Sequence, residues 1–231
     1  MPSSSTLSQK LKVLYEDSHL IAVFKPHRVL TQGDLTGDFS LFEAVKLWLK
    51  AKYSKPGNVY LGLVHRLDRP TAGVVVFAKT SKAASRLSEQ MRSHGFKKRY
   101  RAWVSQELKP HKGTLVHYLD FNEQDKKTRV FSEPQGKRQK AVLNYSTKRR
   151  ENKAFLVEIE LITGRKHQIR AQLSAVGAPI VGDKKYGSDK KFREGAIALE
   201  SCYVSFLHPT TKTMIEISIP EEESAIVGGF T

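Results

Sequence analysis

Four extended segments follow one another between residues 113 and 162, and no helix is expected between them. The residue pattern predicts strands at 113–121, 129–131, 139–147 and 154–162, joined by polar turns. Parallel neighbours need a crossover of a dozen or more residues, so strands with connections this short pair antiparallel. This stretch therefore predicts an antiparallel sheet.

A central strand is expected at 74–78, a continuous run of β-branched and aromatic residues. Strands that are buried on both faces have this pattern, and Gly73 permits a close approach of the chain before it. Helical spacing of apolar residues predicts helices at 40–52, 81–91 and 165–176. Ser40 is a suitable N-cap for the first of them.

Further strands are expected at 12–16, 19–25, 99–105, 196–206 and 213–219. Neither an internal repeat nor a low-complexity linker divides the chain. Together the elements predict one α+β domain over residues 1–231, a large mixed, mainly antiparallel sheet with flanking helices. The core is expected from about residue 12 to residue 220, between a short polar N-terminal tail and a frayed acidic C-terminal tail.

The composition points to a folded protein with a polyanionic partner. Its 231 residues are 39% hydrophobic, and 39 Lys and Arg against 23 Asp and Glu give a formal charge of +16. Basic residues cluster at 97–101, 137–153 and 184–193, with Tyr and Phe among them. One such cluster can be a solvated face, but three favour a surface that neutralises phosphates and stacks on unpaired bases. Nucleic acid is therefore expected before an anionic membrane.

The single cysteine, Cys202, excludes an internal disulfide framework and any multi-cysteine zinc site. The N-terminus lacks a basic flank followed by an apolar core, and no stretch approaches 18 consecutive apolar residues. A cytoplasmic protein without membrane contact is therefore expected.

One carboxylate, Asp68, lies between Arg66 and Arg69 just before the predicted central strand. Two nearby cations favour the ionised carboxylate, and an ionised aspartate can act as a nucleophile. The alternative is a loop salt bridge without a catalytic role, because ion-pair networks also surround structural carboxylates. The residues alone leave both interpretations open.

Five separated motifs, taken in order, resemble the RluA family of pseudouridine synthases. The second contains His-Arg-Leu-Asp-Arg, the third Lys-Arg-Tyr, and the fourth Thr-Gly-Arg-Lys-His-Gln-Ile-Arg. The motifs lie at 14–17 with 23–26, 65–73, 98–104, 161–170 and 182–187. Because the matches spread from Leu14 to about Pro220, the resemblance covers most of the chain.

The resemblance implies an enzyme that isomerises uridine to pseudouridine in ribosomal or transfer RNA, on a base that is flipped out of its stack. It implies that Asp68 is the nucleophile and that Tyr100 stacks on the target base. Arg170 would pair with Asp68, with Arg165 as the alternative partner. Without the motifs, Tyr100 is a half-buried strand aromatic and Arg170 a helix-surface cation.

By the same resemblance, Arg66 fills the space that the flipped base leaves. The other expected substrate contacts are His65, Arg69, Arg165 and His167. Neither a metal nor a cofactor is expected, and the partner is an RNA stem-loop bound by a monomer. Whether Asp68 attacks the ribose C1′ or the uracil ring stays open, and Tyr100 is the only candidate for a general acid or base.

Two positions depart from the family pattern. Ala72 stands where a Ser is usual, and Gln172 where a His is often found; these supporting positions bear on substrate preference more than on activity. Family members often carry an N-terminal S4-type RNA-binding module, but only about a dozen residues precede Leu14. A stand-alone catalytic domain is therefore expected, with a slight preference for a compact stem-loop.

Three other classes of protein fit the sequence less well. A two-metal nuclease needs clustered carboxylates, whereas Asp68 has cations for neighbours, and Asp120 and Asp183 show no ligand spacing. A non-catalytic RNA-binding module would have lost the Asp, the Tyr or the basic partner, and all three types are present. A peripheral membrane protein needs an amphipathic helix with a Lys/Arg-rich polar face, which no predicted helix provides.

Overall fold

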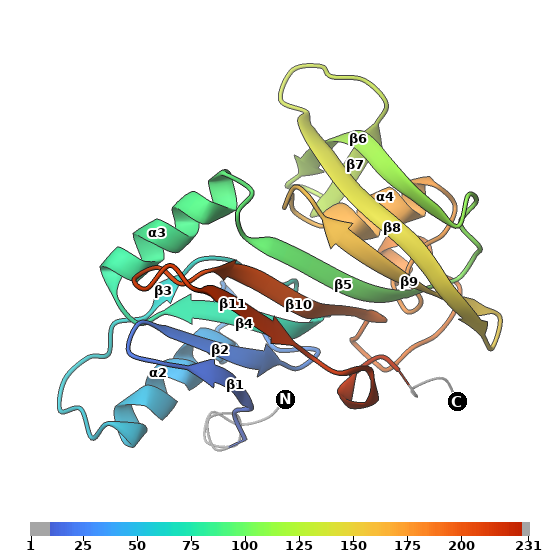
Figure 1. The fold of residues 1–231 in the computed structure, drawn as a ribbon. Coiled ribbons are helices and arrows are strands. Elements are labelled where there is room, and N and C mark those ends of the chain that lie inside the picture. The colour runs from blue at the N-terminus through green and yellow to red at the C-terminus, as the bar shows by residue number, and fades with distance from the viewer. Residues whose placement is uncertain (1–9, 228–231) are drawn as a thin grey trace. The chain divides into compact units, whose positions relative to one another are not determined.

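The computed structural model describes residues 10–227, so most of the predicted N-terminal tail lies outside it. The chain divides into two compact units (Figure 1). Among the described residues, the first unit contains those up to Phe96 together with Tyr203–Ile219, and the second contains Lys97–Cys202 and those from Pro220 to residue 227. A single domain over residues 1–231 stays a prediction.

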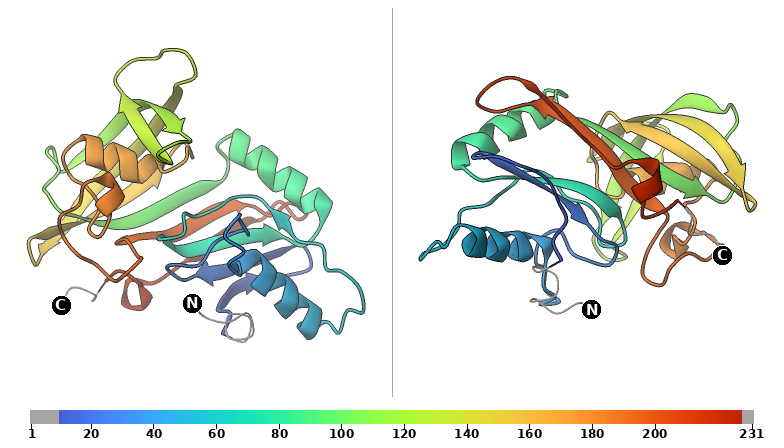
Figure 2. Two further views of the ribbon diagram at one scale, coloured as in Figure 1. Left: turned by 180° about the vertical axis from the view of Figure 1, so that it is seen from behind. Right: turned by 60° about the horizontal axis from the view of Figure 1, so that its bottom comes forward.

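The first unit is a small antiparallel sheet with one helix on each face (Figure 2). The helices are α2 (Leu41–Lys52) and α3 (Ser81–Arg92). The strands are β1 (Val13–Glu16), β2 (Leu20–Lys25), β3 (Gly62–Leu63), β4 (Ala72–Ala78), β11 (Met214–Ser218) and the second half of β10 (Leu199–Leu207). All but the two-residue β3 match strands that the sequence predicts.

The core of the first unit follows the alternation of β4. Val74 and Val76 belong to one cluster with Leu87 of α3, while Phe77 on the opposite face meets Phe42 of α2 with ring centroids 6.0 Å apart. Every residue of β4 is buried, as expected for a strand covered on both faces. Gly73 has φ +125°, a conformation that other residues rarely adopt, so a glycine is required where β4 begins.

Helix α2 starts with a capping box at Ser40. The Ser40 hydroxyl accepts the backbone N–H of Glu43 at 3.3 Å, and the Glu43 carboxylate accepts the N–H of Ser40 at 2.8 Å. These bonds satisfy backbone donors that have no partner within the helix. The predicted N-cap is confirmed.

Replacing Ser40 by Ala is expected to lower the free energy of unfolding of this unit by about 1 kcal/mol, the usual effect of losing an N-cap. Urea denaturation of wild type and variant measures the difference. The control is Ser81→Ala at the exposed first residue of α3, where no such bond is lost. Equal losses in the two variants would contradict the role of the cap.

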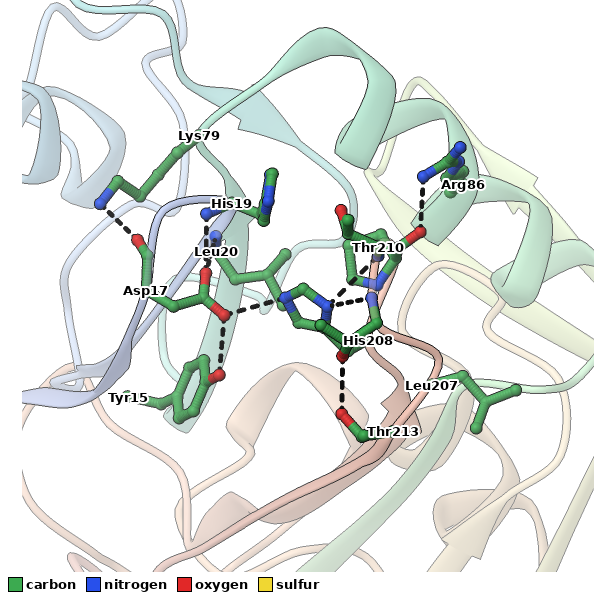
Figure 3. Close-up of polar contacts among 12 residues, drawn as sticks. Tyr15, Asp17, His19, Leu20, Lys79, Arg86, Leu207, His208, Thr210 and Thr213 are labelled. Carbon is green, nitrogen blue, oxygen red and sulfur yellow. Dashed lines mark hydrogen bonds and ion pairs between the residues drawn. The ribbon is translucent and has the colours of Figure 1, made fainter.

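Hydrogen bonds connect the β1–β2 turn to the β10–β11 turn (Figure 3). The Asp17 carboxylate accepts the Tyr15 hydroxyl at 2.7 Å and Nε2 of His208 at 2.9 Å. Nδ1 of His208 accepts the N–H of Thr210 at 3.2 Å, so the proton of the neutral ring lies on Nε2, toward Asp17. Burial, with the bond to Asp17, raises the pKa of Tyr15 to about 12. The turns are therefore held by specific bonds as well as by packing.

The second unit contains five complete strands and the first half of β10, and a helix packs on this sheet. The helix is α4 (Gln168–Ala175), followed by the 3-10 turn η1 (Lys184–Tyr186). The strands, in spatial order, are β5 (Lys97–Val104), β9 (Ala154–Leu161), β8 (Gln139–Glu151), β6 (Lys112–Asn122) and β7 (Lys127–Phe131). Antiparallel pairing of consecutive strands with short connections is confirmed.

Among the described residues, the strands connect in the order β1-β2-β4-β10-β5-β9-β8-β6-β7, with β3 on β4 and β11 on β10. Every pairing with a described register is antiparallel. The predicted α+β fold with a large, mainly antiparallel sheet and flanking helices is therefore confirmed.

The C-terminal segment differs from the frayed tail that the sequence predicts. Residues Glu221–Glu223 form the 3-10 turn η2, and Ile226 is fully buried. The indole N–H of Trp103 donates to the carbonyl of Ile226 at 3.0 Å, and the buried carboxylate of Glu200 accepts the N–H of Ala225 at 2.8 Å. The acidic run thus leads into a segment that packs on the second unit up to residue 227.

Candidate active site

Asp68 lies in the loop between β3 and β4, and this loop is fixed on both sides of it. The carbonyl of Asp68 accepts the N–H of Thr71 at 3.0 Å, which forms a turn into β4. On the other side, the buried Thr31 hydroxyl donates to the carbonyl of Leu67 at 2.8 Å and accepts its N–H at 3.1 Å. The partly buried side chain of Asp68 thus projects from a backbone with defined geometry.

Lys25, the last residue of β2, is fully buried beneath this loop. Its ammonium donates to the carbonyls of Val29 at 2.7 Å, Pro26 at 3.1 Å and Arg69 at 3.2 Å. Burial lowers the pKa of Lys25 to about 7, and the negative charge of Asp68 partly offsets this effect. Lys25 therefore joins the loop after β2 to the loop that carries Asp68.

The lowered pKa of Lys25 predicts a pH dependence of stability. The unfolded chain keeps Lys25 protonated up to its ordinary pKa of 10.5, whereas the folded chain releases the proton near pH 7. Between these values the unfolded state binds more protons. The free energy of unfolding therefore rises with pH, by up to about 1.4 kcal/mol per pH unit from this group.

Lys25→Met removes this titration. Urea denaturation between about pH 7 and pH 9 should show the stability of wild type rising relative to that of Lys25→Met. The control is Lys50→Met, at an exposed lysine of α2 in the same unit, for which the difference from wild type should not depend on pH. A difference between wild type and Lys25→Met that is constant over this range would contradict the prediction.

The residues that flank Asp68 have different surroundings. Arg66 is exposed, whereas Nη2 of Arg69 donates to the carboxylate of Asp38 at 2.6 Å. Nε2 of His65 accepts the backbone N–H of Val76 at 2.9 Å, so the imidazole supports β4. His65 and Arg69 are thus parts of the local structure, and the substrate contacts expected of all three residues stay predictions.

Arg170 of α4 is buried with only 5% of its surface exposed, so its description as a helix-surface cation is wrong. Its Nε donates to Oδ2 of Asp183 at 2.7 Å and its Nη2 donates to Oδ1 at 2.9 Å. The guanidinium carbon lies 4.9 Å from the centre of the Tyr186 ring. A guanidinium has five N–H donors, so one that binds Asp183 in this way can also bind a second carboxylate. Pairing of Arg170 with Asp68 stays a prediction.

Helix α4 begins at Gln168, three residues after the predicted start at 165. His167 adopts a left-handed conformation with φ 55°, which interrupts a helix. The side-chain oxygen of Gln168 accepts the N–H of Arg165 at 3.0 Å and the hydroxyl of Thr163 at 2.8 Å. The motif at 161–170 therefore forms a turn that the Gln168 side chain holds in place. The sequence did not suggest this structural function of Gln168.

His167 and Arg165 lie on this turn. Nδ1 of His167 is 2.9 Å from the hydroxyl of Tyr186, which also accepts the N–H of Thr128 at 2.8 Å. Burial raises the pKa of the Tyr186 hydroxyl, which favours its neutral form. Arg165 is exposed, and its Nε donates to the carbonyl of Lys140 at 3.2 Å. Substrate binding by His167 and Arg165 stays a prediction.

Tyr100 lies on β5 opposite Ile159 of β9, and only 6% of it is exposed. Ala102, two residues on, shares its face and is fully buried. Tyr100 therefore lies on a face of β5 that packs inward, and its stacking on a base stays a prediction.

Gln172, one of the two departures from the family pattern, joins α4 to the sheet. Its side-chain nitrogen donates to the carbonyls of Ala141 at 3.2 Å and Leu115 at 3.3 Å.

Over residues 10–227, no group of three or more His, Cys, Asp or Glu side chains could hold a metal ion. No helix in that part of the chain is long and apolar enough to span a bilayer.

Comparison with solved structures identifies the fold. Two human structures, RNA Pseudouridylate Synthase Domain Containing 4 and 1, share the fold, with TM-scores of 0.77 and 0.72 at 22% and 21% sequence identity. The first alignment covers 94% of this chain and 92% of that structure. The second covers 92% of this chain and 84% of that structure. The fold is that of a pseudouridine synthase domain.

Sequence comparison places the chain more closely. The family model described as RNA pseudouridylate synthase matches residues 19–175. Ribosomal large subunit pseudouridine synthase D of Zymomonas mobilis is 32% identical over 89% of this chain and 68% of its own length, and synthase C of Escherichia coli is 31% identical over 91% and 66%. This chain belongs to the RNA pseudouridylate synthase family, whose members are isomerases, and the predicted relationship to the RluA group is confirmed. The chain spans about two thirds of the length of these relatives.

Proposed function

We propose that this chain converts specific uridines of structured RNA to pseudouridine, with Asp68 as the nucleophile. The observation that carries the proposal is the anchored loop of Asp68. Bonds from Thr31 and Thr71 fix the backbone on either side of the carboxylate, and the buried Lys25 holds the loop from below. A fixed carboxylate in a chain of this family is the arrangement that covalent catalysis needs.

The reaction breaks the bond between N1 of uracil and C1′ of ribose, turns the base, and joins C5 to C1′. The proton on C5 is lost and N1 gains one, so the atoms balance without an oxidant or a metal. Asp68 supplies the electron pair for the covalent intermediate, at C1′ or at the uracil ring. Tyr100 stacks on the flipped base, and Arg170 pairs with Asp68 and orients it.

The binding partner in this proposal is a stem-loop of ribosomal or transfer RNA. The formal charge of +16 supports a polyanionic substrate. The relatives named as ribosomal large subunit synthases support ribosomal RNA as the first substrate to test. The exposed Arg66, two residues before Asp68, would enter the space left by the flipped base. We further propose that the chain acts as a monomer in the cytoplasm.

Transcripts of large-subunit ribosomal RNA and of transfer RNAs, incubated with the protein, test this function. Pseudouridine is located by carbodiimide adducts that stop reverse transcription. A stop at one or a few uridines that requires the protein is expected, and the responding RNA identifies the substrate class. Salt-sensitive binding of both RNAs without any new stop would instead support a non-catalytic RNA-binding module.

A further inference from the structure

Lys98, the second residue of β5, is a partly buried lysine that the proposed mechanism does not use. Successive side chains of a strand point to opposite faces, so Lys98 shares the face of Tyr100. Its neighbours Lys97 and Arg99 lie on the other face and are exposed. Lys98 therefore lies on the opposite face of β5 from the other basic residues of the cluster at 97–101.

The ammonium of Lys98 lies against the turn at 161–170. A Cβ atom added to Gly164 would be only 3.1 Å from Nζ of Lys98, so the absence of a side chain at Gly164 leaves room for the ammonium. Over residues 10–227, Nζ has neither a hydrogen bond nor an ion pair. Burial is the sole cause of a lowered pKa at Lys98, and no carboxylate opposes it.

An ammonium that is partly removed from water and lacks an acceptor is unfavourable for folding. A lysine side chain is flexible and can usually place its charge in water. Placement on the buried face beside Tyr100 is therefore best explained by an acceptor that arrives with the substrate. Ionisable groups whose pKa is shifted by burial are common at functional sites.

We propose that the ammonium of Lys98 binds a carbonyl oxygen of the target uracil and stabilises the negative charge that the base acquires when its bond to C1′ breaks. This inference rests on the proposed function. Residues two apart on a strand are separated by about 6.6 Å, which a lysine side chain spans, so a base stacked on Tyr100 lies within reach of Lys98.

The step balances without a proton transfer. The electron pair of the N1–C1′ bond passes to uracil, where N1 and the two carbonyl oxygens share the negative charge. The positive charge left at C1′ is shared with the ribose ring oxygen or neutralised by a bond from the Asp68 carboxylate. The ammonium donates a hydrogen bond to one of the uracil carbonyl oxygens and keeps its protons. The bond is stronger to the charged base than to neutral uridine, so it lowers the barrier more than it tightens binding.

Lys98→Met tests this role, because it removes the charge and keeps most of the apolar side chain. With enzyme in excess over RNA, the single-turnover rate constant of Lys98→Met is expected to fall by about 10²-fold, as for loss of one oxyanion-stabilising donor, and Lys98→Arg should recover much of it. The RNA Kd should stay within about threefold of wild type. The matched control is Lys112→Met, at an exposed lysine of β6 in the same unit, which should leave the rate constant unchanged.

Gly164→Ala provides a second test, because it displaces the ammonium without removing charge. A several-fold slower rate is expected in the wild-type background and no further loss in Lys98→Met, since both changes act through one group. Wild-type rates in Lys98→Met would overturn the proposal. A raised Kd with an unchanged rate constant would also overturn it and make Lys98 a phosphate contact. Failure of the proposed function itself would appear separately, as a wild-type protein without turnover.

Discussion

Replacing Asp68 by Asn is expected to abolish turnover, with a loss of at least about 10⁴-fold in the single-turnover rate constant. The amide has nearly the shape of the carboxylate but is not nucleophilic, so the loop and the RNA-binding surface stay intact. The RNA Kd should change by less than about threefold. Pseudouridine formation and RNA binding are measured on the same protein sample.

Asp38→Asn is the matched control. Asp38 accepts a hydrogen bond from Arg69 at 2.6 Å, so this change weakens an ion pair of the same loop and leaves Asp68 in place. A loss of less than about tenfold is expected, because the pair is partly exposed. Similar losses in the two variants would indicate that Asp68 is one more structural ion-pair partner, which the sequence alone leaves open.

Replacing Asp183 by Asn is expected to lower the free energy of unfolding of the second unit by about 3–5 kcal/mol, the usual effect of breaking a buried ion pair from one side. The side chains of Arg170 and Asp183 are 6% and 1% exposed, so the guanidinium would be left buried and poorly compensated. Guanidinium-chloride denaturation of the second unit measures the loss. A change below about 1 kcal/mol would show that the pair is not needed for stability.

Glu200→Gln is the matched control for Asp183→Asn. Glu200 is fully buried in the same unit, but the nearest nitrogen of its partner Arg101 is 3.8 Å away, beyond hydrogen-bonding distance. A smaller loss of stability is therefore expected. Among molecules that stay folded, Asp183→Asn should also slow turnover, because Arg170 loses its fixed orientation, whereas Glu200→Gln should not. Equal turnover in the two variants would contradict a positioning function of Asp183.

Local patterns predicted most of the elements. The apolar run of β4, the spacing of α2 and α3, and the consecutive strands β6 to β9 are properties of neighbouring residues, and the structure confirms them. The start of α4 and the packed C-terminal segment were predicted incorrectly. Both depend on contacts that a pattern does not contain: the side chain of Gln168 holding the turn before α4, and the bond from Trp103 to Ile226.

The candidate site shows the same division. The motifs named Asp68, Tyr100 and Arg170 as candidates, and their functions stay predictions. The burial of Arg170 and its bond to Asp183, 13 residues away, depend on tertiary structure. Lys25 was missed because a lysine at the end of an apolar strand usually reaches water. Its burial appears only once the carbonyls of Val29 and Arg69 are in place around it. Contacts between residues that only folding brings together cannot be predicted from local sequence patterns.

The most direct test of the central claim is release of tritium from RNA transcribed with uridine that is tritiated at C5. Isomerisation must exchange this hydrogen, so the signal reports the chemical step itself. We predict release by wild-type protein from ribosomal RNA fragments or from transfer RNA, and none by Asp68→Asn at equal RNA occupancy. Release by Asp68→Asn at the wild-type rate would contradict the assignment of the nucleophile, and no release by either protein from either RNA would contradict the proposed activity.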